Sequence, residues 1–146
     1  MKILVRAPNW IGDQVLAYGF YRELRRRHPN AEIVSACVPW VSALQFREQV
    51  SRVFVLKPPA DHLGPLGRVS HLLAEGKRLR QDHGVFDAAY ALPNSLSAAV
   101  LLWGAGARQR IGYATEGRSL FLTNRRNWKK LGSGVHRAQA YVKLLG

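Results

Sequence analysis

Residues 2–38 decide the fold of the chain: KILVRAPNWIGDQVLAYGFYRELRRRHPNAEIVSACV. The first six of these residues are mostly aliphatic and contain no turn former, which favours a buried strand. Apolar residues then recur at helical spacing over 14–27, and three arginines end that stretch, where cations suit the helix dipole. Residues 32–38 favour a second strand. Because a helix crosses between the two strands, they can lie parallel, and the segment is predicted to be a βαβ unit.

The same alternation continues along the chain. Further strands are expected at 52–57, 86–92 and 108–113, and further helices at 40–47, 66–79, 96–103 and 136–145. Residues 120–122 suggest one more short strand, and residues 124–134 suggest a basic loop. Five strands separated by helices predict an α/β fold, a doubly wound parallel sheet with helices on both faces.

Composition points to one cytoplasmic domain that covers residues 1–146. A hydrophobic fraction of 47% is enough for a packed core. The single cysteine, Cys37, cannot form an internal disulfide, which favours a reducing compartment. The first residues lack the apolar core of a signal peptide, and the longest apolar run, 98–107, is about half of a membrane span.

The charge of the chain calls for an anionic partner. Twenty-two Lys and Arg residues against nine Asp and Glu residues give a net charge of +13, and residues 105–146 carry nine basic groups and one acidic group. Nucleic acid, an anionic membrane surface and a phosphorylated or carboxylated ligand all fit this charge. In a parallel sheet, such a ligand is expected beyond the carboxyl ends of the strands.

Several common sites are missing from the sequence. The turn after the first strand lacks the three glycines of a dinucleotide fingerprint, and the chain has no phosphate-binding loop, no metal-ligand spacing and no serine nucleophile elbow. We therefore expect no cofactor and no bound metal. Gly12 and Asp13 remain, at the opening of the first helix. Asp13 has two possible roles: it caps the helix, or its carboxylate receives a proton from a ligand hydroxyl.

Taken together, the motifs resemble the ADP-heptose:lipopolysaccharide heptosyltransferases of glycosyltransferase family 9. The resemblance runs along nearly the whole chain, and it is specific only in combination. It rests on the segments 2–15, 20–24, 28–33, 90–95 and 110–113, together with Gly117, Arg118, His136, Arg137 and Tyr141.

The resemblance implies an inverting, metal-independent enzyme of the GT-B architecture, in which two Rossmann-like domains enclose the active site. This chain would be the N-terminal, acceptor-binding half. The domain that binds ADP-heptose would be absent from it, so we expect the chain alone to be inactive. The implied acceptor is the lipopolysaccharide inner core, a Kdo-lipid A whose phosphates and carboxylates suit the positive charge. The implied location is the cytoplasmic face of the inner membrane, with no nucleic acid as partner.

The resemblance also implies roles for particular residues. Asp13 would be the general base that deprotonates the acceptor hydroxyl. The candidate acceptor-binding residues are Asn9, Trp10, Gly12, Asn94, Ser95, Arg110, Arg118, His136 and, from a variable loop, Arg68. Asn94 could equally cap a helix, and His136 could simply begin the last helix. Two other functions stay open: transfer from another nucleotide sugar, and a basic nucleic-acid-binding module.

Overall fold

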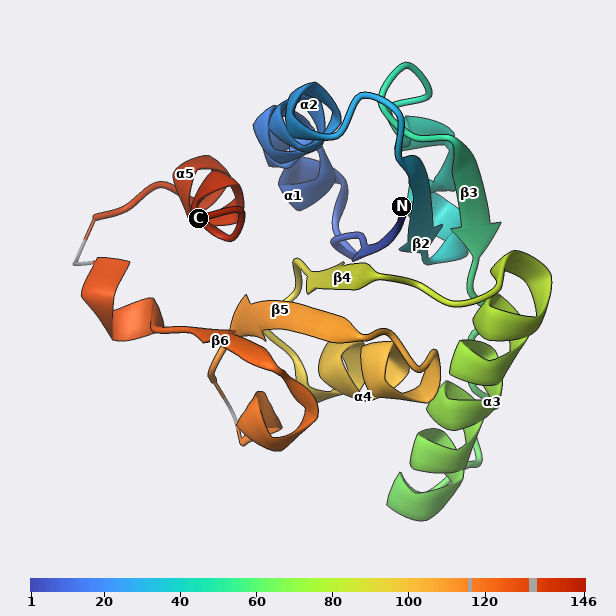
Figure 1. Cartoon of the computed structure of the whole chain (residues 1–146). Helices are drawn as coiled ribbons and strands as arrows, with labels where there is room; N and C mark the ends of the chain where they lie inside the picture. Colours follow the sequence, from blue (N-terminus) through green and yellow to red (C-terminus); the bar gives the residue numbers. More distant parts are fainter. Residues whose placement is uncertain (116, 132–133) are drawn as a thin grey trace.

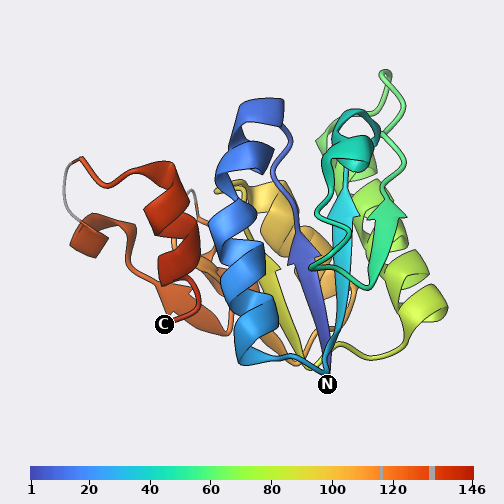
Figure 2. The ribbon, with the colours of Figure 1, turned by 90° about the horizontal axis from the view of Figure 1, so that it is seen from above.

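The computed structural model describes residues 1–115, 117–131 and 134–146 and contains a six-stranded parallel sheet. The strands lie in the order β3-β2-β1-β4-β5-β6, and all of them run in the same direction (Figure 2). Their bounds are β1 Lys2–Arg6, β2 Glu32–Cys37, β3 Arg52–Val55, β4 Ala88–Ala91, β5 Gln109–Tyr113 and β6 Asn124–Arg126. The order reverses direction at β1, which confirms the predicted doubly wound sheet.

Helices cover both faces of the sheet (Figure 1). On one face lie α1 (Ile11–Leu16), α2 (Tyr18–Arg27) and α5 (Arg137–Lys143), and on the other lie α3 (Pro65–His83) and α4 (Leu96–Gly104). Side chains of β1 alternate between the two cores: Ile3 and Val5 pack toward α2 and α5, whereas Leu4 packs toward α3 and α4. No helix within the described ranges is both long and apolar enough to cross a membrane.

The structure corrects several expected boundaries. The helix expected over 14–27 begins earlier, at Ile11, and is divided at Ala17 into α1 and α2. The helix expected over 40–47 is a 3-10 helix, Pro39–Leu44. The prediction of a strand at 120–122 is wrong, because Arg118–Phe121 forms another 3-10 helix. The sixth strand, β6, lies instead within the expected basic loop, and a third 3-10 helix, Trp128–Leu131, follows it.

Helices α3 and α4 cross closely at two glycines. A Cβ atom on Gly76 would lie 2.5 Å from the carbonyl carbon of Gly104 and 2.6 Å from the backbone nitrogen of Ala105. Only hydrogen fits in that space, which explains why a glycine with poor helix propensity stands in the middle of α3.

Candidate functional site

The segment after β1 brings Asp13 to the carboxyl edge of the sheet. Helix α1 begins directly after a short turn, and Asp13 is the third residue of that helix. The helix is capped without any side-chain hydrogen bond, with Trp10 at the N-cap position, so the alternative role of Asp13 as the capping residue is wrong. The carboxylate is 22% exposed and therefore reachable from solvent.

Asp13 forms an ion pair with Arg137 from the other end of the sequence. The Nη1 atom of Arg137 donates to Oδ2 of Asp13 at 3.3 Å. The same guanidinium also interacts with the hydroxyl of Tyr141, one turn further along α5. Burial raises the pKa of Tyr141 to about 12, and the charge of Asp13 adds to that shift, so the Tyr141 hydroxyl keeps its proton at neutral pH.

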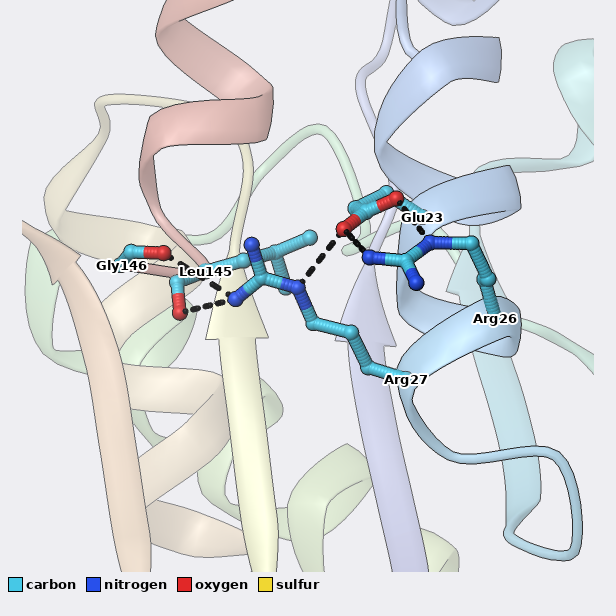
Figure 3. Close-up of polar contacts among 5 residues, drawn as sticks. All are labelled: Glu23, Arg26, Arg27, Leu145 and Gly146. Carbon is cyan, nitrogen blue, oxygen red and sulfur yellow. Dashed lines mark hydrogen bonds and ion pairs between the residues drawn. The ribbon is translucent and has the colours of Figure 1, made fainter.

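Helix α5 is held at its C-terminal end by arginines. Arg27 of α2 donates from Nη1 to the carbonyl oxygens of Leu145 and Gly146 at 3.0 and 3.1 Å, and from Nε to Glu23 at 2.9 Å (Figure 3). Arg126 of β6 donates to the Leu144 carbonyl oxygen at 3.3 and 3.4 Å. Cations at this end of a helix offset its dipole, and these bonds fix the helix that carries Arg137.

Space is open beside the carboxylate. A Cβ atom on Gly12 would meet nothing within 4 Å, so neither packing nor backbone strain explains the glycine at this position. Trp10, at the start of the helix, is 71% exposed. These two candidate residues therefore lie next to Asp13 on an accessible surface.

Asn9 is engaged within the protein. Its side-chain Oδ1 accepts a hydrogen bond from Nη2 of Arg6 at 2.8 Å, and its carbonyl oxygen accepts one from Nε1 of Trp40 at 2.6 Å. Asn9 thus connects the turn before Asp13 to the end of β1 and to the 3-10 helix that follows β2.

Asn94 and Ser95 follow β4 at the same edge. Ser95 is the N-cap of α4 and accepts from the Ala98 nitrogen at 3.3 Å, so the capping role expected of Asn94 belongs to its neighbour. The side-chain Oδ1 of Asn94 is buried, and none of the described residues forms a hydrogen bond with it. It lines a cavity of about 20 Å³ together with Arg137 and Tyr141, which places Asn94 in the neighbourhood of the Asp13 ion pair.

Two of the candidate arginines have structural contacts instead. Arg118 is fully buried and donates to the carbonyl oxygens of Tyr113, Pro93 and Ser95 at 2.6, 2.6 and 3.0 Å. It braces the segments that follow β4 and β5, and the expectation that it contacts an acceptor is corrected. Arg110 lies near the beginning of β5, away from the carboxyl edge, and donates to the Ala107 and Phe121 carbonyl oxygens at 2.8 and 2.7 Å.

His136 begins α5, as the alternative interpretation expected. Its Nδ1 atom accepts a hydrogen bond from the Ala138 nitrogen at 3.2 Å, so His136 is the N-cap of the helix. The imidazole remains exposed at the surface.

Arg68, expected in a loop, lies instead in the first turn of α3. It lines a separate cavity of about 240 Å³, which we call the edge cavity. This cavity opens at the carboxyl ends of β1, β2 and β3, on the α3 side of the sheet, and its lining also includes Arg6, Trp40, Lys57, Pro58, His71 and Glu75. Asp13 is not part of this lining. Of the candidate residues, Trp10, Gly12 and Asn94 thus lie near Asp13, whereas Arg68 alone lines the edge cavity. Arg110 and Arg118 belong to neither place.

Sequence reasoning missed the contact of Arg137 with Asp13. Arg137 stood within a motif of the family resemblance but received no role of its own, because its contact with Asp13 spans 124 positions of the chain. Within the described ranges, no three His, Cys, Asp or Glu side chains gather as they would around a metal ion.

Comparisons with known proteins agree on one family. Residues 72–145 match the family model described as glycosyltransferase family 9 (heptosyltransferase). Lipooligosaccharide heptosyltransferase 2 of Haemophilus influenzae is 32% identical over 130 residues, which are 89% of this chain and 36% of that protein. Lipopolysaccharide heptosyltransferase 2 of Escherichia coli is 32% identical over 120 residues, or 80% of this chain and 32% of that protein.

The fold agrees as well. The structure of E. coli ADP-heptose lps heptosyltransferase II superimposes with a TM-score of 0.82 and 28% identity over all of this chain and 40% of that one. The chain spans about a third of the length of the curated relatives it matches. Its sheet corresponds to the Rossmann-like N-terminal half of a GT-B heptosyltransferase. From its sequence and its fold, the chain belongs to glycosyltransferase family 9, the heptosyltransferases.

Proposed function

We propose that this chain is the N-terminal, acceptor-binding part of a heptosyltransferase and supplies its general base. The complete reaction moves heptose from ADP-heptose to the lipopolysaccharide inner core, with the nucleotide sugar held by a second domain. The names of the relatives support both substrates. By itself, the 146-residue chain is expected to transfer no heptose.

The observation that carries the proposal is the setting of Asp13. Its carboxylate is reachable from solvent, next to the open space at Gly12 and at the edge where parallel sheets bind ligands. Arg137 engages Oδ2, and the described residues offer no hydrogen bond to Oδ1. That second oxygen is therefore available to an acceptor hydroxyl.

The chemistry follows from one base and no protein nucleophile. Asp13 takes the proton of the acceptor hydroxyl while the oxygen forms a bond to the anomeric carbon of heptose. The bond from that carbon to the ADP oxygen breaks on the opposite face, and the electron pair leaves with ADP. A single displacement of this kind inverts the anomeric centre and requires no metal from this chain.

Arg137 and Asn94 are proposed to meet the acceptor beside the base. The guanidinium of Arg137 is 55% exposed, so a phosphate or carboxylate of the acceptor can reach it. Asn94 lies beside this ion pair, and its buried Oδ1 has no hydrogen-bond partner among the described residues. Trp10 and Gly12 complete this surface, and the net charge of +13 supports peripheral contact with the anionic cytoplasmic face of the inner membrane.

The test is Asp13→Asn in the protein that joins this chain to its donor-binding domain. Loss of the base is expected to lower the single-turnover rate of heptose transfer by about 10²–10⁴-fold. Asp82→Asn, which removes an exposed carboxylate near the end of α3, is the matched control and should leave the rate unchanged. An Asp13→Asn variant that folds and transfers heptose at the normal rate would refute the assignment of the base.

A further inference from the structure

The edge cavity contains a buried arginine at its base. Arg6 is the last residue of β1. Its side chain points to the α3 side of the sheet, opposite to that of Val5, and is only 7% exposed. Its neighbours in register on β2 and β4 are Ala36 and Ala91. Because both neighbours are alanines, the sheet leaves room around the guanidinium.

Among the residues that the structure describes, no carboxylate balances the charge of Arg6. Its hydrogen bonds go to two neutral acceptors, the Ala7 carbonyl oxygen at 2.6 Å and Oδ1 of Asn9 at 2.8 Å. No carboxylate of the described residues lies within ion-pair distance of it. Burial lowers the pKa of Arg6 to about 10, which still leaves the guanidinium charged at neutral pH. A buried charge of this kind is costly unless an anion compensates it.

The one acidic side chain of the lining is already engaged. Glu75 is 5% exposed, and its Oε2 accepts from Nε and Nη2 of Arg78 at 3.0 and 2.6 Å. Its Oε1 accepts from the backbone nitrogen of Lys57 at 3.2 Å. Since Arg78 balances Glu75, the cations of Arg6, Lys57 and Arg68 give the cavity an excess of positive charge.

Apart from His71 and Ser97, the rest of the wall is apolar. Pro58, Pro59 and the indole of Trp40 line the cavity, and Trp40 is held by its Nε1 bond to the Asn9 carbonyl oxygen. An apolar wall with a few converging charged groups is typical of sites for small organic ligands. The apolar face of a sugar ring can lie against such a wall while its anionic substituent reaches Arg6.

We propose that the edge cavity binds the anionic group, phosphate or carboxylate, of an acidic sugar, with Arg6 as the residue that compensates its charge. The assignment of that sugar to the acceptor of heptose transfer rests on the proposed function, whereas the binding itself does not. The ligand would lie on the α3 side of the turn 7–10, with Asp13 on the other side.

The experiment titrates the 146-residue chain with three probes and follows backbone amide NMR shifts. Glucose 1-phosphate carries a phosphate, glucuronate carries a carboxylate, and glucose carries neither. At least one anionic probe should shift the amide resonances of residues that line the edge cavity, whereas glucose should not. Comparison of the two acids identifies whether phosphate or carboxylate binds more tightly. Arg6→Gln should weaken that binding about tenfold or more, because a charged hydrogen bond is lost. Arg22→Gln removes an exposed positive charge on α2 and should change nothing.

Each outcome decides the matter. Binding that is equal for glucose, absent for both acids or unchanged in a folded Arg6→Gln protein overturns the proposal. If Arg6→Gln does not fold, the double variant Lys57→Gln with Arg68→Gln, both at exposed positions, takes its place. Unchanged affinity in that double variant, relative to Arg22→Gln with Lys77→Gln, also overturns it. Because no assay here measures transfer, failure of the Asp13 proposal would leave these results intact.

Discussion

Gly76→Ala tests how closely α3 and α4 must approach each other. On helix propensity alone, alanine in the middle of α3 should stabilise the protein by about 1 kcal/mol. The structure predicts the opposite sign. The new methyl group would lie 2.5 Å from the Gly104 carbonyl carbon and 2.9 Å from its Cα, which are backbone atoms that no side-chain rotation can move away.

Extra carbon in a packed interior costs about 1–3 kcal/mol, and a clash with rigid backbone belongs to the upper part of that range, about 2–3 kcal/mol. The gain in helix propensity offsets about 1 kcal/mol of this cost, so the expected net effect is a loss of about 1–2 kcal/mol in the free energy of unfolding. Urea denaturation followed by circular dichroism measures it. Gly19→Ala in α2 is the matched control, because its Cβ would lie 3.6 Å from Val142, an ordinary contact, and that variant should be neutral or more stable. A Gly76→Ala protein as stable as the unchanged chain would refute the close crossing. The variant should also weaken ligand binding in the edge cavity, whose wall includes Arg68 and Glu75 of α3.

Three further outcomes follow from the contacts described above. Cys37 is fully buried, and burial raises the pKa of its thiol to about 11. A thiol reagent at pH 8 should therefore react with Cys37 only after denaturant unfolds the chain. Fast reaction of the folded chain would contradict this prediction. Two arginines lower the pKa of Glu23 from 4.5 to about 2, so its contribution to stability is complete above about pH 4.5 and disappears as the pH falls toward 2. Glu23→Gln should therefore flatten the plot of unfolding free energy against pH in that window. An unaltered plot would count against the cluster of Figure 3. Arg137→Ala removes a partly exposed ion pair, so the free energy of unfolding measured with urea should fall by less than about 1 kcal/mol. In the protein that joins this chain to its donor-binding domain, the same variant should raise the KM for the acceptor. An unchanged KM would remove Arg137 from the proposed site.

The central part of the fold was predictable because its local signals agree. The aliphatic run before the first turn, the helical spacing after it and the second strand all predict a βαβ unit, and β1 and β2 pair in parallel as expected. The sixth strand carried no such signal. Its residues, Asn124, Arg125 and Arg126, are polar, and they join the edge of the sheet through backbone pairing with β5.

The site was predictable only in part, for a related reason. Asp13 stands out in sequence because Gly12 and Asp13 follow a buried strand, whereas its partner Arg137 belongs to a basic tail in which many arginines look alike. Arg118 was expected to bind the acceptor, and its sequence neighbours do not indicate that it is buried. The carbonyl oxygens that bury it come from loops after two different strands, and their meeting point depends on the tertiary fold.

The most direct test of the central claim is acceptor binding by the 146-residue chain, measured from amide NMR shifts with a soluble, phosphorylated Kdo-containing oligosaccharide. The proposed function predicts shifts at residues 9–13, at Asn94 and at Arg137, all near the carboxyl edge of the sheet. Arg137→Ala should weaken this binding, whereas Arg22→Gln should not. The account is contradicted if the oligosaccharide leaves the amide resonances of these residues unchanged. It is also contradicted if the oligosaccharide shifts instead the resonances of residues 28–31 and 84–87, at the opposite edge of the sheet.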